Sequence, residues 1–427
     1  MAVDLSNKTA TVIDNGLFVE LAIRLAREDG FGTVNYWSPY ECAFPRWNEY
    51  DIGRGFPGVT RLDSPWQAIG VKDNTWIFPD TYHRWTAKFL RDHRRAAVWA
   101  AFDAEQIELD REFGLDTMAA AGVGVPETTI LTGVTELKAH LKGLRQGVKV
   151  WIKSSFTRGE GETWAHEDWE QSEAHIDNQV VPRLGVNKEE RVFLVTEDIN
   201  PAVEIGGDQL NVDGQPFSHA LYGYEVKGVG YAGAFKPYEK LPAVIRDYDE
   251  KLAPFMADCG ARTFASSELR VYAKGKAVAI DPCIRLGNPP NQAIVEAYGN
   301  LPQLLYAGAR GEILPVEPVD PYWYILMLES EEANEAWTPL AMPEKLRQWV
   351  KLRFCCEVAG KLGVIPQSAK VPMLGGAVGH GQTMDDAYDM ARDIAEEVKA
   401  FGLIAHVREC DTAQGYIDDG KKYGIEF

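Results

Sequence analysis

Apolar and polar positions recur with two different periods along the chain, which predicts strands and helices that follow one another. A short β-rich run at residues 10–13 meets a loop at 14–16, and apolar residues from Leu21 onward then recur at helical spacing. A second apolar run, at 76–78, ends at Pro79. Strand, loop and helix in this order are typical of a parallel sheet, so the pattern predicts a parallel α/β region near the amino end.

The middle of the chain shows a longer mixture of both periods. A helix ending at Gly122 precedes a strand and a capped amphipathic helix, and a strand-like run at 148–155 then leads into a polar loop. Turn residues at 213–214 and 274–275 each join two β-rich runs, which favours hairpins. The expected strands are 128–131, 191–199, 205–212, 219–226, 266–274 and 276–282, and the expected helices are 105–121, 135–144, 241–257 and 292–309.

Residues 310–345 are rich in Pro and Glu, and we expect them to form a connection. The last part of the chain mixes a strand at 349–357 with a helix at 384–401. The whole pattern indicates the α/β class with α+β portions. A chain of 427 residues is long enough for two or three domains, since domains typically have roughly 100–200 residues.

Composition narrows the class of protein further. The formal net charge is −19, and this acidic balance argues against nucleic acid as a partner, because neutralising phosphates requires clustered Lys and Arg. The sequence has no long apolar run and no basic segment followed by an apolar one at its start, so we expect neither a membrane span nor secretion. None of the six cysteines forms a C-x-x-C pair, which favours a reducing, cytoplasmic setting.

Asp80, Tyr82 and His83 follow the apolar run at 76–78 and are candidates for a substrate site. In open parallel sheets, ligands bind outside the carboxyl ends of the strands. The alternative is that Asp80 caps the next helix and that His83 is an ordinary surface or packed side chain.

Lys153 begins the first of three pieces that together suit phosphoryl transfer, a reaction that needs cations beside the phosphates and an anionic cage for a metal ion. Hydroxyl, arginine and glycine residues follow it, namely Ser155, Arg158, Gly159 and Gly161. A lysine that leaves a strand can direct its ammonium at phosphates while backbone amides close over them. The alternative is a surface lysine and a flexible turn, and no Walker loop is present.

The second piece is acidic and lies at the end of a predicted strand. It contains Glu197, Asp198 and Ile199, followed by Glu204. Backbone groups at such a hinge can bind adenine, and a carboxylate can bind ribose hydroxyls. The alternative is that these acidic residues are simply solvated.

The third piece contains Glu268 and Arg270 on one predicted strand, and Asp281 and Arg285 on or after its hairpin partner. Two carboxylates that converge in a cleft repel each other unless a cation lies between them. Mg²⁺ takes oxygen ligands of this kind, and an arginine nearby can contact phosphate. The alternative is two carboxylates at the rim in separate salt bridges.

Taken together and in this order, the three pieces resemble the ATP-grasp superfamily, and phosphoribosylamine–glycine ligases in particular. The segments 225–235 and 280–290 and the Gly-rich tail at 376–381 are similar to segments of that family. The resemblance implies an ATP-grasp fold with a Rossmann-like N-terminal domain at 1–105. An ATP-grasp domain would follow at 106–330, with a lid-like subdomain at about 125–200, and a small α+β domain at 331–427.

The resemblance also assigns roles to individual residues. Lys153 and the loop after it would bind the phosphates of ATP, the hinge at 197–199 would bind adenine, and Glu204 would bind the ribose. Glu268 and Asp281 would ligate Mg²⁺ or Mn²⁺. The expected catalytic residues are Arg285, Lys227 and Arg270.

Two positions depart from the pattern of the resembled family. Cys283 stands where that family has an asparagine metal ligand, and a soft thiol is a poor ligand for Mg²⁺. Asn288 or a water molecule are alternatives for this role. The first loop contains Asp14 and Glu20 but only Gly16 as glycine, which makes a poor phosphate cradle because anions repel anions. The amine substrate is therefore expected to be something other than phosphoribosylamine.

These expectations describe an ADP-forming carboxylate–amine ligase that works through an acyl phosphate. Its substrates would be an amino acid or another small carboxylate, together with a cationic or neutral amine. The alternative is a nucleotide-binding ATP-grasp protein without ligase activity, acting as a sensor or scaffold. The sequence leaves a monomer and a homodimer equally open.

Overall fold

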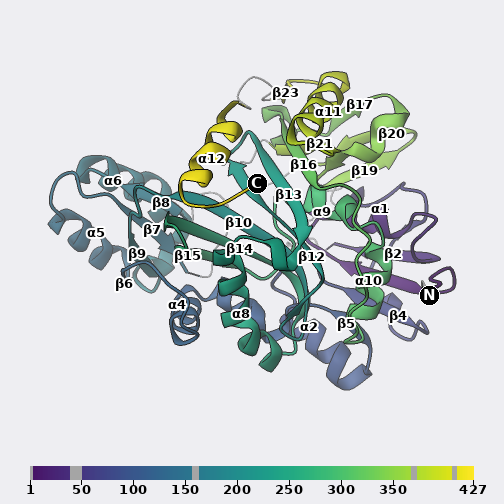
Figure 1. The fold of residues 1–427 in the computed structure, drawn as a ribbon, viewed down its shortest axis with the longest axis horizontal. Helices are drawn as coiled ribbons and strands as arrows, with labels where there is room; N and C mark the ends of the chain where they lie inside the picture. The colour runs from purple at the N-terminus through teal and green to yellow at the C-terminus, as the bar shows by residue number, and fades with distance from the viewer. Residues whose placement is uncertain (1–2, 39–50, 156–162, 367–372, 406–410) are drawn as a thin grey trace.

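The computed structural model describes residues 3–38, 51–155, 163–366, 373–405 and 411–427. Within these residues, strands form sheets of five, ten, four and four members. The ten-stranded sheet lies in the middle, a smaller α/β unit projects to one side of it, and the N-terminal sheet lies across from that unit (Figure 1). No described helix is long and apolar enough to cross a membrane.

The N-terminal sheet is parallel, as the strand–loop–helix pattern predicted. Its order is β3-β2-β1-β4-β5, and β1 pairs in parallel with both β2 and β4. The strands are β1 Thr9–Ile13, β2 Thr33–Trp37, β3 Val59–Arg61, β4 Asn74–Ile77 and β5 Ala97–Trp99. Helix α1 (Val19–Leu25) follows β1. The order reverses between β1 and β4, and in doubly wound sheets such a reversal opens a crevice at the carboxyl ends of the strands.

The projecting unit has its own sheet and its own hydrophobic core. Its order is β6-β9-β7-β8, with every neighbouring pair antiparallel. The strands are β6 Thr128–Thr132, β7 Val150–Ser154, β8 Thr163–His166 and β9 Val192–Glu197, and the helices are α5 Val134–Gly143, α6 Trp169–His175 and α7 Val181–Leu184. Leu137 and Ile152 are fully buried in this separate core. Its strands and helices lie between residues 128 and 197, and the lid-like subdomain at about 125–200 stays a prediction.

The large sheet is antiparallel and follows the order β15-β14-β10-β12-β13-β16-β21-β18 along its main path. Its main strands are β10 Val203–Val212, β12 His219–Val226, β13 Gly230–Pro237, β14 Arg262–Ala273, β15 Lys276–Cys283, β16 Tyr322–Glu329, β18 Val350–Leu352 and β21 Met373–Gly381. Helices α8 (Ala243–Asp258) and α12 (Asp411–Lys422) pack against it, and a Cβ on Gly207 would lie 2.7 Å from Ile245 of α8. Because side chains alternate along a strand, Glu204 and Gly206 face the opposite side.

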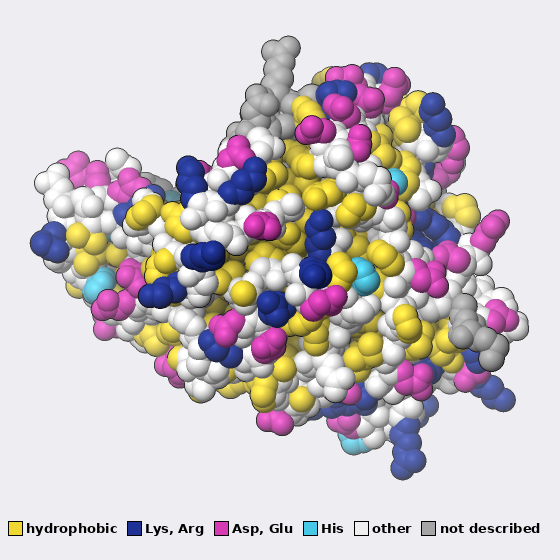
Figure 2. All heavy atoms as spheres, in the orientation of Figure 1, with side chains coloured by type: hydrophobic (Ala, Val, Ile, Leu, Met, Phe, Trp, Pro, Cys, Tyr) yellow, Lys and Arg dark blue, Asp and Glu magenta, His cyan; other side chains and the backbone are white. Residues whose placement is uncertain are grey.

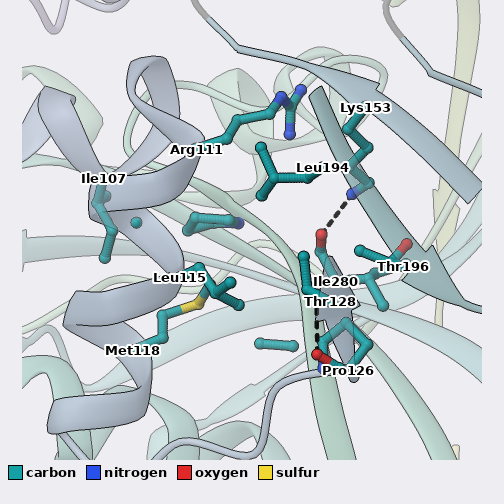
Figure 3. Close-up of a pocket in the computed structure, with 13 residues that line it drawn as sticks. Ile107, Arg111, Leu115, Met118, Pro126, Thr128, Lys153, Leu194, Thr196 and Ile280 are labelled. Carbon is teal, nitrogen blue, oxygen red and sulfur yellow. Dashed lines mark hydrogen bonds between the residues drawn. The ribbon is translucent and has the colours of Figure 1, made fainter. Parts of the chain in front are cut away.

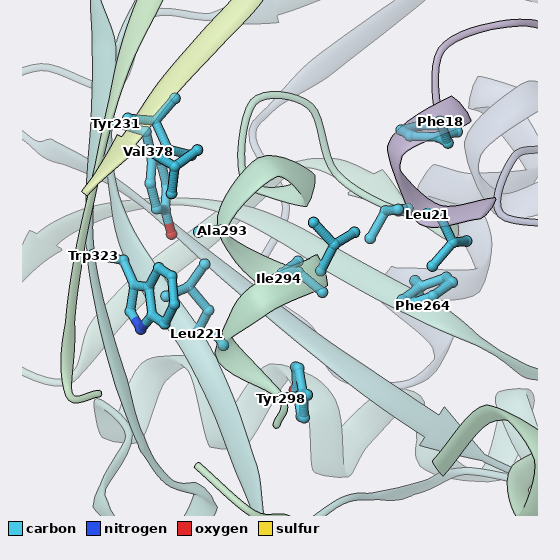
Figure 4. Packing of buried hydrophobic residues seen from close by; sticks show 14 of the residues in the cluster. Phe18, Leu21, Leu221, Tyr231, Phe264, Ala293, Ile294, Tyr298, Trp323 and Val378 are labelled. Carbon is cyan, nitrogen blue, oxygen red and sulfur yellow. The ribbon is translucent and has the colours of Figure 1, made fainter. Parts of the chain in front are cut away.

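Helix α9 (Asn291–Ala297) lies between the large sheet and α1. Figure 4 shows Ile294 of α9 between Trp323 of the sheet and Leu21 of α1. The carboxylate of Glu296 in α9 accepts two hydrogen bonds from Arg27, each 2.7 Å long, and also accepts one from the buried Lys351. This packing gives the N-terminal sheet and the large sheet one continuous core.

The expectation that residues 310–345 form a connection is wrong. This range contains β16, a strand at the middle of the large sheet, in which Trp323 to Leu328 are all buried. Its sequence, YWYILMLE, is apolar on both faces because neighbours cover both sides, so it lacks the period-2 alternation that marks a half-buried strand.

Four other expected elements are divided or shortened. The helix at 292–309 is divided into α9 and α10 (Leu301–Gly308), and that at 105–121 into α3 (Gln106–Leu109) and α4 (Arg111–Ala120). The strand at 349–357 is divided into β18 and β19 (Cys355–Val358) by Phe354, whose φ is +48°. The helix expected at 384–401 is shortened to α11 (Met384–Glu397).

The remaining carboxyl-terminal strands form a small antiparallel sheet beside α11. Its order is β19-β20-β17-β22, where β17 is Thr338–Ala341, β20 is Lys361–Val364 and β22 is Lys399–Ala400. This sheet contacts the first loop of the chain, where the Phe354 amide donates to the Gly16 carbonyl at 2.7 Å. On the molecular face drawn in Figure 2, acidic and basic side chains are interspersed, so the negative net charge does not gather there as one field.

Candidate functional site

One face of the large sheet carries most of the charged candidates. Glu204 pairs in register with Arg270, and Gly206 pairs with Glu268 on the neighbouring strand. Directly paired residues of an antiparallel sheet point to the same side, and residues two apart on a strand share that side. Glu204, Glu268 and Arg270 therefore share a face, and Gly206 leaves the space beside Glu268 free of a side chain.

A β-bulge brings the two candidate metal ligands together. Leu269 pairs with Ala279, but Glu268 pairs with Asp281, so Ile280 is an extra residue on β15. Without this extra residue, Glu268 would lie opposite Ile280 and Asp281 would lie one position further along. Bulges near functional sites commonly redirect a side chain in this way.

Lys153 crosses from the lid-like sheet to this bulge. Its Nζ donates a hydrogen bond to the Ile280 carbonyl and lies 3.7 Å from Asp281 Oδ2 (Figure 3). In a strand without a bulge, the carbonyl of residue 280 would accept a backbone hydrogen bond from the neighbouring strand. The extra residue of a bulge is left without this bond. The bulge thus positions Asp281 and provides the acceptor that holds Lys153.

Beside Lys153 lies a small, partly open pocket between β9, β15 and helix α4. Its walls include the apolar side chains of Leu115, Met118 and Leu194, and Figure 3 shows Lys153 and Arg111 near its upper side. A mostly apolar cavity with a few convergent polar groups is the usual form of a small-molecule site.

Arg111 is a site residue that the sequence reasoning missed. Its Nη1 donates to Asp281 Oδ1 at 3.0 Å, its Nε donates to the Ser154 carbonyl at 3.2 Å, and its backbone N–H donates to Ser155 Oγ at 3.1 Å. The side chain is only 7% exposed. In the sequence it reads as an ordinary charged residue in the first turn of a helix, so no signal distinguished it from a solvated arginine.

Glu108 is a second residue that the sequence reasoning missed. It accepts from Arg285 Nε at 2.7 Å and from the Ile284 backbone N–H at 3.0 Å, so it fixes the segment that leaves β15. Arg285 is buried, which lowers an arginine's pKa, yet Cys283, Glu108 and Asp80 around it raise its pKa well above the ordinary value. Arg285 is therefore a firmly held cation near Asp281.

The two paired carboxylates have opposite pKa shifts. Burial raises the pKa of Glu268 to about 7, and the negative charges of Asp281, Glu204 and Glu225 add to the rise, although Lys227 opposes it. Burial also acts on Asp281, but Lys153 and Arg111 outweigh it and hold the pKa of Asp281 below its ordinary value. Asp281 is thus the anion of the pair, and Glu268 is a carboxylate that an added cation would stabilise.

Cys283 lies at the end of β15, close to these groups. Burial raises the pKa of its thiol well above the ordinary value. In the absence of a metal ion the thiol is therefore protonated at neutral pH, and its soft sulfur is a poor match for Mg²⁺. Asn288, the alternative for this role, accepts a hydrogen bond at its Oδ1 from Asn291 Nδ2 at 3.1 Å.

Glu204, Arg270 and Lys227 form one charged group at the hinge side of the sheet. Arg270 Nη1 lies 3.4 Å from Glu204 Oε2, and its Nη2 donates to the Ile199 carbonyl at 2.9 Å. Lys227 Nζ lies 3.8 Å from Glu204 Oε1 and 3.9 Å from Glu225 Oε2. The structure thus brings Arg270, from the third piece of the sequence analysis, against Glu204 and the hinge at Ile199, which belong to the second piece.

The other hinge side chains have structural partners. Glu197 Oε1 accepts from the Glu127 backbone N–H at 2.9 Å, and Asp198 Oδ1 accepts from Trp151 Nε1 at 2.7 Å. Ser155 Oγ is the acceptor for Arg111 described above. The remaining members of the predicted phosphate loop lie outside the described residues; they are Arg158, Gly159 and Gly161.

A buried acidic pair lies at the carboxyl ends of β1 and β4, where the strand order reverses. Asp14 is fully buried, and its Oδ2 accepts from Tyr36 Oη at 2.7 Å and from the Phe18 backbone N–H at 2.9 Å. Its Oδ1 has no hydrogen-bond partner within the described part of the chain. Burial raises the pKa of Asp14 to about 6, and the charge of Asp80 adds to the rise.

Asp80 joins this pair to the segment after β15. Asn15 Nδ2 donates to Asp80 Oδ2 at 3.2 Å, and the Leu286 backbone N–H donates to the Pro79 carbonyl at 2.9 Å. Arg285 is close enough for the charge of Asp80 to raise its pKa. The carboxyl ends of β1 and β4 therefore lie near Arg285. Tyr82 points outward and is 49% exposed, whereas the His83 ring packs 5.5 Å from the Phe78 ring.

The fold and the grouping of these residues define an ATP-grasp architecture, with a Rossmann-like N-terminal sheet, a small lid-like α+β unit and a large antiparallel sheet. No sequence family and no curated protein matches this chain. Solved structures of similar shape do match, and they confirm the expected ATP-grasp fold.

Three of these structures illustrate the similarity. A phosphoribosylamine–glycine ligase from Thermotoga maritima has a TM-score of 0.70 at 15% identity, with 93% of this chain and 99% of that chain covered. A biotin carboxylase from Campylobacter jejuni, in complex with β-γ-ATP, has a TM-score of 0.65 at 12% identity, with 96% of each chain covered. An L-amino acid ligase from Bacillus licheniformis has a TM-score of 0.60 at 15% identity, with coverage of 93% and 99%.

Proposed function

We propose that this protein is an ADP-forming carboxylate–amine ligase that works through an acyl phosphate. The observation that carries the proposal is the convergence at the β15 bulge, where Glu268 and Asp281 meet the cations Lys153 and Arg111. Arg285 lies at the end of the same strand. The ligases and the biotin carboxylase that share this fold support an ATP-dependent reaction of this class.

The nucleotide is expected to lie between the lid-like unit and the large sheet. Lys153 would bind the phosphates, and the apolar pocket beside it suits a purine ring. The side chains of Glu197 and Asp198 accept hydrogen bonds within the lid-like unit, so the backbone groups of these two residues would bind the adenine. Glu204, which is 33% exposed, is the carboxylate available to ribose hydroxyls.

Glu268 and Asp281 fit a Mg²⁺ or Mn²⁺ ion. The described residues contain no cluster of three or more metal-ligating side chains, and Mg²⁺ bound with a nucleotide typically takes one or two carboxylates, with phosphate oxygens and water as the rest. The raised pKa of Glu268 fits as well, because an uncompensated carboxylate is what a cation would stabilise. When bound, the ion would neutralise charge on the phosphates.

The chain's own residues would divide the chemistry among them. Arg285, fixed by Glu108, would stabilise negative charge on the phosphoryl group in transfer, and Lys227 and Arg270 would add positive charge at the other side. The lid-like unit would exclude water, which otherwise hydrolyses an acyl phosphate. In the first step the carboxylate oxygen would attack the γ-phosphorus of ATP and displace ADP. In the second step the neutral amine would attack the acyl carbon and displace phosphate, and the proton that the amine loses would go to solvent.

The amine substrate is expected to bind in the crevice at Asp14 and Asp80. The two acidic side chains and Asn15 form an anionic, hydrogen-bonding wall, which suits an ammonium group and repels a sugar phosphate. The unpartnered Oδ1 of Asp14 offers an acceptor inside that wall. The crevice lies near Arg285, so a bound amine would lie on the side where the acyl phosphate forms.

A screen of ADP release tests the proposed reaction. Purified protein with Mg-ATP would be incubated with amino acids and small carboxylates, singly and in pairs with amines. We expect ADP and phosphate to form only when a carboxylate and an amine are both present. Lys153→Ala serves as the blank.

Two results would count against the ligase. Release of AMP and pyrophosphate would exclude an acyl-phosphate route. Tight ATP binding with no turnover for any pair would instead favour the alternative function, a nucleotide-binding sensor or scaffold, which the neutral thiol of Cys283 at a usual metal position motivates.

Asp14→Asn is expected to raise the KM for the amine by about tenfold or more, since a charge-assisted hydrogen bond is worth roughly 1.5–3 kcal/mol. Because the pKa of Asp14 is raised to about 6, its carboxylate is protonated below that value. The wild-type KM should therefore rise as the pH falls through about 6, and the KM of the variant should not. Steady-state kinetics at varied amine concentration measure both effects.

Asp63→Asn is the matched control, because Asp63 is an exposed carboxylate on the same N-terminal domain. Its kinetics should match those of the wild type. Circular dichroism would show whether the Asp14→Asn variant is folded. If it is folded and keeps the wild-type KM for the amine, the amine does not bind in this crevice.

A further inference from the structure

A second pocket lies at the amino ends of the parallel strands of the N-terminal sheet, whereas Asp14 and Asp80 lie at the carboxyl ends. It has a volume of about 520 Å³, and its wall includes Asn74 and Ala97, which begin β4 and β5. Asp14 and Asp80 follow the carboxyl ends of β1 and β4. The pocket is therefore separate from the proposed ligase site, with the length of the parallel strands between them.

The lining of this pocket is strongly basic. Four arginines contribute to it, and Asp73 is the one carboxylate among the described residues that line it. The arginines are Arg94, Arg95, Arg262 and Arg310. In a chain with a net charge of −19, such a concentration of guanidinium groups marks a local positive field.

Most of this positive charge is not neutralised by neighbouring carboxylates. Arg262 is paired with Asp213 at 3.2 Å, and Asp73 is paired with Lys8 at 3.2 Å. In the described part of the chain, no carboxylate oxygen lies within 4.0 Å of the remaining arginines; they are Arg94, Arg95 and Arg310. Arg94 and Arg95 are exposed to solvent, so both are accessible to a ligand.

Arg310 is held in place by neutral groups. Its Nη1 donates to Thr75 Oγ1 at 3.0 Å and to the Tyr306 carbonyl at 2.8 Å, and its guanidinium lies 3.6 Å from the centre of the Tyr306 ring. Asp73 and Glu312 act on it only from a distance, and burial lowers its pKa. A guanidinium fixed by neutral partners keeps its charge and its other donors for an anion.

Asn74 forms part of the wall of this pocket. It is 7% exposed, and its Oδ1 accepts from Thr11 Oγ1 at 3.0 Å, which in turn accepts from Asn35 Nδ2 at 3.3 Å. This chain of donors fixes the orientation of the Asn74 amide. Its Nδ2 has no acceptor within the described residues. The Nδ2 atom is itself buried from solvent, so Asn74 shapes the wall of the pocket and does not present this donor to it.

We propose that this pocket binds a small organic polyanion, either a phosphate ester or a polycarboxylate. Guanidinium groups recognise both kinds of anion through charge-assisted hydrogen bonds. Trp76, Ile69 and Ala68 also line the pocket and provide apolar contacts for a carbon skeleton. A nucleic acid does not fit, because the site is a concavity on an acidic protein rather than an extended basic surface.

Calorimetric titration of the full-length protein with pyrophosphate and with citrate tests this proposal. Saturating ATP analogue and Mg²⁺ would be present, so that the nucleotide site cannot bind the probes. We expect saturable binding that weakens with added salt, and the preferred probe tells phosphate from carboxylate chemistry. Acetate, which carries a single charge, should bind far more weakly.

The double variant Arg94→Gln/Arg95→Gln is expected to weaken binding by about tenfold or more, since each charge-assisted hydrogen bond is worth roughly 1.5–3 kcal/mol. Both side chains are exposed and unpaired, so the variant should fold normally. Arg54→Gln, which removes an exposed arginine elsewhere on this domain, is the control.

Three results would overturn the proposal. The first is the absence of saturable binding of either probe at millimolar concentration. The second is equal binding by the double variant and the wild type. The third is loss of binding in Lys153→Ala, because that loss would assign the probe to the proposed nucleotide site. These outcomes do not depend on whether the protein is a ligase.

Discussion

Exchanging Glu268 for Gln is expected to lower ADP formation by at least about 100-fold, the loss typical when one preorganised electrostatic stabiliser is removed from an active site. The physical reason is the cross-strand pair at the β15 bulge. Glu268 and Asp281 lie opposite each other, and Gln at position 268 leaves a single carboxylate there. Steady-state ADP release at increasing Mg²⁺ measures the effect, and half-saturation should move to higher Mg²⁺.

Glu112→Gln provides the matched control, because Glu112 is an exposed carboxylate next to Arg111 and does not face the bulge. It should leave both the rate and the Mg²⁺ dependence unchanged. If Glu268→Gln retains the wild-type rate and the wild-type Mg²⁺ dependence, Glu268 is not a metal ligand. A loss of rate with an unchanged Mg²⁺ dependence would also count against that role.

The β15 bulge shows why the site was only partly predictable. The spacing of Glu268 and Asp281 in the sequence suggested that they converge across a hairpin, and the register agrees with that suggestion. A regular hairpin with the observed pairing of Leu269 and Ala279 would, however, place Ile280 opposite Glu268. The extra residue has no marker in the sequence, since an isoleucine fits a regular strand equally well.

The two site residues that the sequence analysis missed are charged residues on helices. Arg111 and Glu108 contact Asp281 and Arg285, yet both lie on short helical segments rich in other charges. Their burial depends on how α3 and α4 pack against β15, which is a property of the tertiary structure. Periodicity predicts helices and strands, but it does not say which of several charged residues on a helix is buried.

The same limit explains the errors in the fold. Strands β10 and β14 are each followed by the turn signals that the sequence analysis used. The buried strand β16 had none, and the Pro and Glu residues on both sides of it concealed it. The parallel N-terminal sheet was predicted because its first strand, loop and helix follow each other closely.

Exchanging Lys153 for Ala is expected to reduce ADP formation by about 100-fold or more and to raise the KM for ATP, since it removes a cation from the phosphates. The structure adds a second consequence. Lys153 Nζ also contacts Asp281 at 3.7 Å and the Ile280 carbonyl, so its loss frees the lid-like sheet from the bulge. ATP kinetics and limited proteolysis of the lid-like unit measure the two consequences separately.

Lys149→Ala is the matched control, because Lys149 lies in the same lid-like unit and pairs with Glu167 away from the bulge. It should behave as the wild type in both assays. A double-mutant cycle of Lys153→Ala with Asp281→Asn tests the contact itself. Residues in direct contact are coupled by about 0.5–3 kcal/mol, so the double variant should lose less activity than the product of the single losses. Fully multiplicative losses would mean that Lys153 acts on the nucleotide independently of Asp281, and unchanged kinetics in Lys153→Ala would exclude it from the phosphate site altogether.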